Sequence, residues 1–250
     1  MTGLPRLAVA AIVMLTAQPC RAATVQPETG LFGARAYVTG TRPETRTEAI
    51  ASAFRKVLVK VSGNPALADD PRVEALQTLA AGLVEDIVYI DRMSDEPHHD
   101  EQGTRDRPFD LTVRFDPAKI DAALRLLGDT PYTQRSHVLV RIEVDDHGAT
   151  YKLTADAEAD ERQREALIAA ADQFGLRVIL TPLQGDPPLL RSDTVILSGT
   201  LAWSEPAFGW VGAWHLEGAG KPRYWRVEGV SFDDAYRNAM SGVVAILTGH

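Results

Sequence analysis

The sequence predicts an α+β protein with two small layered domains, each built on a mainly antiparallel sheet. Some short segments alternate apolar and polar residues, which is typical of half-buried strands, whereas others repeat apolar residues with the period of a helix. In chain order these segments read β-α-α-β-β-α and then β-β-α-β-β-β-β-α. Strands and helices that are grouped in this way favour α+β layers over a doubly wound parallel sheet.

The first 22 residues have the pattern of a secretory signal peptide. A short start containing Arg6 precedes an apolar run of 11 residues, Leu7 to Ala17, whereas a helix needs about 20 apolar residues to span a bilayer. Cys20 and Ala22 supply the small residues of a cleavage site. We therefore expect cleavage near Ala22/Ala23, release into the periplasm and no stable membrane insertion afterwards.

Cys20 is the only cysteine, and cleavage would remove it. The mature chain could then form no disulfide, so its apolar core must provide its stability. The chain has a formal net charge of −8 at pH 7, and the leader holds two arginines and no acid, so the mature chain is more acidic still. An acidic chain without a long basic block argues against nucleic acid as a partner. No pattern in the sequence predicts a cofactor.

Residues 23–130 form the first predicted domain. The expected elements are a strand at 31–38, a helix from Thr45 to Gly63, a helix from Asp70, strands at 87–90 and 109–115, and a helix over 117–127. Thr45 and Glu48 have the spacing of a capping box, which predicts where the long helix starts. We interpret Ser62-Gly63-Asn64 as the end of that helix, because glycine suits a left-handed residue at this position. A ligand-binding loop is the alternative.

Residues 92–108 contain Met93 as their only large apolar side chain, so we expect an exposed hairpin loop there. Its His98 and His99, followed by two acids, form the densest group of metal-capable side chains. Adjacent side chains on an extended backbone point to opposite sides, so these histidines are weak candidates for a shared metal ion. We predict no metal site.

A polar connection at 129–133 leads to the second predicted domain, residues 135–250. The expected elements are strands at 137–144 and 149–154, a helix over 160–174, a strand at 177–183, strands near 194–203, 210–217 and 223–229, and a final helix. Ser231 and Asp234 have the spacing of an N-cap and its third helical residue, which places the start of the final helix.

Parts of the first domain resemble a known family. The segments FRKVLVKVSGN from Phe54 to Asn64 and LTVRFDP from Leu111 to Pro117, with a helix ending at Gly128, are similar to the DUF2066 family of exported proteobacterial proteins of unknown function. The resemblance extends over about residues 31–130, and the strand from His137 stands where that family has a second domain. Tyr132 departs from the Trp that family members often carry there. The resemblance implies export, and no functional residue follows from it.

Common catalytic motifs are absent from the sequence, including His-Glu-x-x-His, Gly-x-Ser-x-Gly and the phosphate-binding glycine loops. Two groups of acids are still candidates for chemistry. Asp145-Asp146-His147-Gly148 has the composition of a hairpin turn, and Asp233 with Asp234 lies at a predicted helix start, where acids are favourable. We therefore interpret both groups as structural and assign no catalytic residue.

All four tryptophans fall between residues 203 and 225. Trp210 and Trp214 share one face of a strand by period two, and Trp225 lies on the next strand. One interpretation is a core beneath the final helix, because aromatic cross-strand pairs stabilise a sheet. The alternative is a partly exposed surface in which Trp210, Trp214 and Trp225 bind a partner.

The leading hypothesis is a soluble, non-enzymatic periplasmic protein that acts as a binding or assembly module of the cell envelope, with an envelope protein as its partner. It rests on the export signal, the missing catalytic motifs and the paired small domains. The alternative is a periplasmic hydrolase of envelope polymers that uses carboxylates such as Asp145 or Asp233 as acid and base. An enzyme requires titratable groups that converge in a concave pocket, whereas a binding module requires only a surface or groove.

Overall fold

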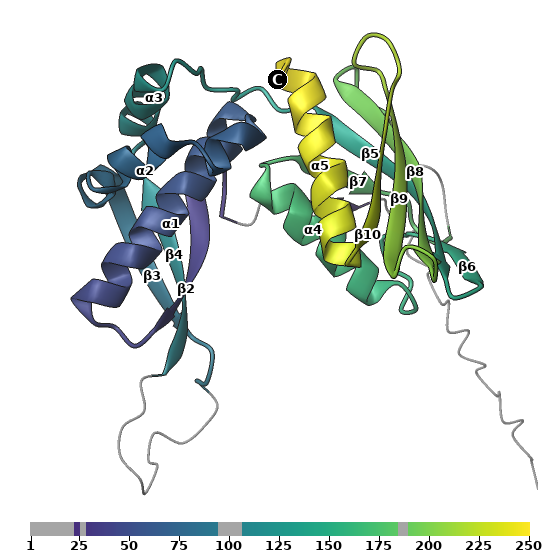
Figure 1. Ribbon diagram of the computed structural model, residues 1–250, viewed down its shortest axis with the longest axis horizontal. Helices are drawn as coiled ribbons and strands as arrows, with labels where there is room; N and C mark the ends of the chain where they lie inside the picture. The colour runs from purple at the N-terminus through teal and green to yellow at the C-terminus, as the bar shows by residue number, and fades with distance from the viewer. Residues whose placement is uncertain (1–22, 26–28, 95–106, 185–189) are drawn as a thin grey trace, which may run out of the picture.

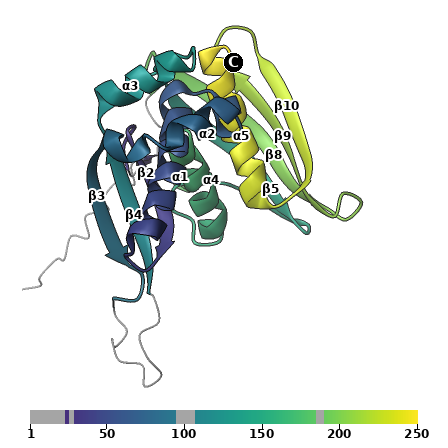
Figure 2. The same ribbon diagram turned by 60° about the vertical axis from the view of Figure 1, so that its left-hand side comes forward.

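The computed structural model describes residues 23–25, 29–94, 107–184 and 190–250 and has the expected α+β fold. Its strands form a sheet of three strands and a sheet of seven. In Figure 1 the small sheet and its helices lie on the left, and the large sheet and its helices lie on the right. Figure 2 shows the long helices of both groups between the two sheets. The predicted leader, Cys20, His98 and His99 lie outside the described residues.

The small sheet is antiparallel and has the order β2-β4-β3, with β2 at Gly33–Thr39, β3 at Val84–Asp91 and β4 at Pro108–Phe115. Helix α1, Pro43–Ser62, covers one face of it. The contact is apolar, since the ring centroid of Phe54 on α1 lies 5.9 Å from that of Phe115 on β4 and both side chains are fully buried.

The remaining helices of this half are short: η1 at Pro65–Ala68, α2 at Pro71–Gln77, η2 at Ala80–Leu83 and α3 at Pro117–Leu126. Each of the two α-helices follows an aspartate and begins with proline. The carboxylate of Asp70 accepts a hydrogen bond from the N–H of Arg72, and that of Asp116 accepts one from the N–H of Lys119. The predicted start of α2 at Asp70 is confirmed.

The predicted capping box is wrong, because α1 begins at Pro43, ahead of Thr45. Proline is favourable in a first helical turn, where its missing N–H has no partner to lose and its fixed φ suits the helix. The hydroxyl of Thr45 instead donates a hydrogen bond to the carbonyl of Arg42, at 3.0 Å. The predicted end of the helix is confirmed, since Gly63 adopts a left-handed φ of 71°.

The large sheet has the order β1-β7-β5-β8-β9-β10, and β6 pairs with β5. Its strands are β1 (Ala23–Val25), β5 (His137–Asp146), β6 (Ala149–Lys152), β7 (Arg177–Leu180), β8 (Thr194–Ser204), β9 (Gly209–Glu217) and β10 (Arg223–Val230). Strand β5 runs parallel to β7 and β8, and the other pairs are antiparallel. The sheet is therefore mixed around its central strand.

One face of the large sheet is covered by α4, Glu161–Gln173, and α5, Phe232–Thr248. Alternate residues of the strands, such as Val140 and Leu197, are fully buried on this covered face. Within the described ranges, no helix has the length and apolarity needed to cross a bilayer.

Strand β1 belongs to the large sheet, although the sequence assigns residues 23–130 to the first domain. Ala23 pairs with Leu180 and Val25 with Val178, so β1 forms an edge of the sheet beside β7. The predicted start of the first domain at residue 23 is therefore wrong for residues 23–25, because they pair with a strand of the second half.

The two halves meet at a buried polar contact around Lys60 and Arg135. Lys60 on α1 is 1% exposed, and its Nζ lies 3.3 Å from a carboxylate oxygen of Asp172 on α4. Burial lowers the pKa of Lys60, and the charge of Asp172 opposes this shift. Arg135 donates hydrogen bonds to the carbonyls of Val61, at 3.2 Å, and Phe174, at 3.4 Å. These bonds tie the end of α1 to the end of α4.

Gly63 also permits a close approach of α5. A Cβ at this position would lie 2.6 Å from Cγ2 of Thr248 and 2.8 Å from Cγ2 of Val244. The hydroxyl of Thr248 donates a hydrogen bond to the Gly63 carbonyl, at 3.2 Å. The same glycine thus ends α1 and allows α5 to pack against it. The sequence predicted the first role and not the second.

Candidate functional site

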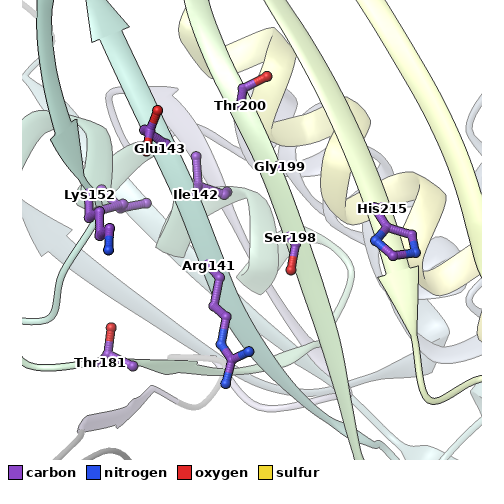
Figure 3. Close-up of a pocket in the computed structure, with 10 residues that line it drawn as sticks. Arg141, Ile142, Glu143, Lys152, Thr181, Ser198, Gly199, Thr200 and His215 are labelled. Carbon is purple, nitrogen blue, oxygen red and sulfur yellow. The ribbon is translucent and has the colours of Figure 1, made fainter.

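The face of the large sheet opposite α4 and α5, which we call the open face, holds a hollow of about 560 Å³. Figure 3 shows it with α5 behind the strands. Arg141 on β5 pairs with Ser198 on β8, Ser198 with His215 on β9, and His215 with Tyr224 on β10. Paired residues on neighbouring strands point to the same face. These four side chains therefore form one row across the sheet, which we call the polar row.

The lining of this hollow carries charged side chains of both signs. Glu143 on β5 and Lys152 on β6 oppose each other in the hairpin register and line the hollow with Thr200. In the described part of the chain, neither the guanidinium of Arg141 nor the ammonium of Lys152 has an ion-pair partner. The hollow thus presents two cations without an ion-pair partner, the carboxylate of Glu143 and hydroxyl groups.

The far end of the polar row is a stacked pair of rings. The centroids of His215 and Tyr224 are 4.2 Å apart and their planes differ by 2°. Tyr224 is 74% exposed, and Nε2 of His215 lies 3.6 Å from a carboxylate oxygen of Glu217. The imidazole lies flat against the phenol ring, so this end of the row is partly aromatic.

A second hollow, of about 350 Å³, lies on the covered face, beside the β5–β6 turn and the first turns of α4 and α5. Its aromatic walls are Trp203, Trp210 and Phe232, and we call it the aromatic pocket. The centroids of Trp203 and Trp210 are 5.9 Å apart at 81°, and those of Trp210 and Phe232 are 6.3 Å apart at 89°. These edge-to-face contacts hold successive rings nearly perpendicular to one another.

The β5–β6 turn contributes to this pocket as well as reversing the chain. Asp145 accepts a hydrogen bond from the N–H of Gly148, at 2.8 Å, so the interpretation of this group as a hairpin turn is confirmed. His147 has a left-handed φ of 54°, its Nδ1 lies 2.7 Å from the Asp146 carboxylate, and its ring stacks on Trp203 with centroids 4.8 Å apart. The turn thereby fixes an imidazole on an indole.

Acidic side chains dominate the polar lining of the aromatic pocket. Asp146, Glu158 and Glu161 contribute carboxylates, against the single guanidinium of Arg162. That guanidinium lies over the ring of Phe232, 6.0 Å from its centroid. The pKa of Tyr151, which also lines the pocket, is raised by burial and then by the charge of Asp146.

The tryptophans that the sequence singled out contribute mainly to the core. Trp214 is 2% exposed, and its indole N–H donates to the side chain of Asn238 on α5, at 3.2 Å. Trp225 lies against Gly242 on α5, where a Cβ would be 2.5 Å from its ring. Trp210 is 7% exposed and borders the aromatic pocket. This burial favours the core interpretation over a binding surface at Trp214 and Trp225.

Trp203 is one of the pocket residues that the sequence reasoning did not single out; the others include Tyr151, Glu158, Glu161 and Arg162. Trp203 pairs with Trp210 across β8 and β9, and it follows Leu197 and Leu201 on the covered face of β8. The same period-two pattern could have placed Trp203 on the apolar face of its strand. Its contact with His147 had no local signal, because the two residues are far apart in the chain.

The two acids of the hydrolase hypothesis lie apart. Asp145 shares the register of Arg141 on the open face, whereas Asp233 lies in the first turn of α5 on the covered face. Ser231 accepts a hydrogen bond from the N–H of Asp234, at 3.1 Å, and donates one to its carboxylate, at 2.7 Å. The bond from Ser231 lowers the pKa of Asp234. The predicted cap of the final helix is confirmed.

No cluster of three or more His, Cys, Asp or Glu side chains suited to a metal ion occurs among the residues that the structure describes. The candidates His98 and His99 are outside those residues.

The comparisons with known proteins give little functional information. No curated protein matches the chain. A crystal structure of an uncharacterized protein is 14% identical, with coverage of 46% of this chain and 90% of that chain, and its TM-score of 0.25 supports no argument. The family model that matches is DUF8605, so the resemblance to DUF2066 is corrected. That resemblance rested on short helix and strand segments, which did not suffice to tell one family from another. Residues 24–130 thus match DUF8605, a domain of unknown function.

Proposed function

We propose that this protein is exported to the periplasm and acts there as a non-enzymatic binding or assembly module of the cell envelope. Export is supported by the signal-like pattern of residues 1–22. Binding is supported by one observation above the others. The polar row crosses a hollow on a sheet face that carries none of the described helices.

The composition of the open face suits a protein partner. Arginine and tyrosine are enriched at protein interfaces and at their most energetic positions. Arg141 can hold a carboxylate through two parallel hydrogen bonds, and Lys152 adds a second cation near it. Neighbouring strands are about 4.8 Å apart, so the row from Arg141 to Tyr224 extends over roughly 14 Å. The partner in this proposal is an envelope protein with an acidic surface segment.

The hydrolase alternative has less support. Hydrolysis by a pair of carboxylates needs both groups beside the scissile bond, within about 5–10 Å of each other. Asp145 and Asp233 belong to opposite faces of the large sheet. No observation among the described residues favours this alternative, so binding is the function we carry forward.

The test is affinity capture from native envelope extract with three tagged forms of the chain: wild type, Arg141→Glu and Arg46→Glu. Arg46 is exposed on α1, far from the open face, and gives the same change of charge as a control. We expect wild type and Arg46→Glu to retain the same protein and Arg141→Glu to lose it. Equal recovery by all three forms would show that the open face is not the binding surface.

A further inference from the structure

The aromatic pocket has a shape that suits a positively charged organic group. Trp203 and Trp210 meet at 81°, and Trp210 and Phe232 meet at 89°. A cation is attracted to the face of an aromatic ring, most strongly to tryptophan, and sites that recognise alkylammonium groups use several rings at once. Perpendicular rings allow one bound group to contact more than one of them.

The charge of the lining points to the same class of ligand. Asp146, Glu158 and Glu161 line the pocket together with the rings, and Arg162 is the only arginine or lysine that lines it among the described residues. An anionic ligand would face three carboxylates, of which Asp146 is hydrogen-bonded to His147, and a neutral ligand would gain only hydrogen bonds from them. A cation gains from both the rings and the carboxylates.

The protein already places one of its own cations in this pocket. The guanidinium of Arg162 lies 6.0 Å from the centroid of Phe232, within the range of a cation–π contact. Arg162 itself is exposed at the start of α4. It therefore occupies a ring face that a ligand could use, and it repels any second cation.

We propose that the aromatic pocket is a binding site for an organic ammonium group, as carried by a quaternary amine or by a lysine side chain. Trp203 and Trp210 contact the group, Glu158 and Glu161 balance its charge, and Arg162 competes with it. This inference goes beyond the proposed function, because the aromatic pocket and the open-face hollow lie on opposite faces of the large sheet.

The first experiment measures binding of three ligands to the purified full chain by isothermal titration calorimetry. The ligands are choline, Nα-acetyl-lysine amide and 3,3-dimethyl-1-butanol. The last compound has the shape of choline, with carbon in place of the charged nitrogen. We expect saturable binding of choline or of the lysine derivative, whichever ammonium the pocket accommodates. The neutral alcohol should bind at least about fivefold more weakly, as the loss of a cation–π contact implies.

Three variants locate the binding in the aromatic pocket. Arg162→Gln should tighten ammonium binding several-fold, because it frees the Phe232 face and removes a like charge. Arg46→Gln, an exposed change far from the pocket, should leave it unchanged. Trp203→Leu should abolish binding. If Trp203→Leu does not fold, Arg162→Gln still decides, since a purely structural role for Arg162 predicts no gain in affinity.

Several results would overturn the proposal. Equal binding of choline and the neutral alcohol would identify an apolar hollow without selection for charge. Binding of N-acetylglucosamine in the absence of ammonium binding would identify a saccharide site. If Arg162→Gln bound the ammonium ligand as weakly as wild type or more weakly, the ligand would not bind in the aromatic pocket. The capture experiment with Arg141→Glu tests the open face, which is a different surface. The proposed function and the ammonium site can therefore fail independently of each other.

Discussion

Along β8 and β9, the two faces of the large sheet are built by the same strands and have opposite characters. On β9, Trp214 is 2% exposed beneath α5, while the next residue, His215, belongs to the polar row of the open face. Side chains alternate along a strand, so a step of one residue moves from the core to the hollow. The apolar residues of the strands and the two helices packed on them thus lie on the same face of the sheet, which becomes the core.

The strongest test of this contrast compares Trp214→Ala with His215→Ala. Truncation of a large buried aromatic side chain costs about 3–5 kcal/mol, so Trp214→Ala should unfold at much lower denaturant concentration. His215→Ala changes the open face and should stay within about 1 kcal/mol of wild type. Urea unfolding of both variants checks this. Similar losses in the two variants would mean that the open face is packed as well.

A second test uses the space that glycine leaves for Trp214. A Cβ at Gly199 on β8 would lie 2.5 Å from the carbonyl oxygen of Ala213 and 2.6 Å from the Trp214 ring. Overpacking of this kind costs typically about 1–3 kcal/mol, which is the loss we expect for Gly199→Ala. Ser198→Ala, one residue away on the open face, should change the free energy of unfolding by less than about 0.5 kcal/mol. A Gly199→Ala protein as stable as wild type would show that the Trp214 ring and the Ala213 carbonyl can both move aside.

Much of this arrangement could be predicted from sequence, and the missing parts share a cause. Period two placed Trp210 and Trp214 on one face, and the glycine at 63 ended its helix as expected. The pairing of β1 with β7 and the parallel neighbours of β5 were not predicted. Local periodicity reports which side of a strand is apolar, but it contains no information about which strand lies next to it.

The same limit applies to the candidate sites. The acids near 145 and the tryptophans were noted separately, but the stacking of His147 on Trp203 joins residues from two distant strand ends. The predicted start of α1 was wrong for a different reason. Two helix-start signals lie within a few residues of each other, and the helix begins at Pro43 and not at the capping box of Thr45.

A third test concerns Lys60, which is buried and polar, unlike either face of the large sheet. Burial lowers its pKa in the folded protein, with Asp172 opposing this shift and Arg135 and Lys56 adding to it. Between the folded pKa and the higher unfolded one, the unfolded chain binds more protons, so the free energy of unfolding rises with pH. Wild type should therefore gain stability relative to Lys60→Met as the pH rises from 7 towards 10. Urea unfolding at pH 7, 8.5 and 10 measures the difference, and parallel pH profiles would contradict the expectation.

The smallest expected effect belongs to Arg141→Glu. An exposed side chain without an ion-pair partner contributes little to folding, so the free energy of unfolding should stay within about 0.5 kcal/mol of wild type. Thermal unfolding followed by circular dichroism checks this. A large drop in melting temperature would show that the variant loses partner capture through misfolding, and it would weaken the proposed binding surface.

The position of β1 sets an order of events during folding. Its three residues pair with residues 178–180, so a nascent chain that emerges from its amino end cannot complete this edge of the large sheet until β7 has also emerged. Contacts between such distant segments are slow to form, because a long loop must close before they stabilise anything. Until then, the outer edge of β7 is a free template for other strands, including those of neighbouring chains. Once paired, β1 replaces β7 as this edge of the sheet, and an edge strand of three residues offers few unpaired backbone groups to another chain.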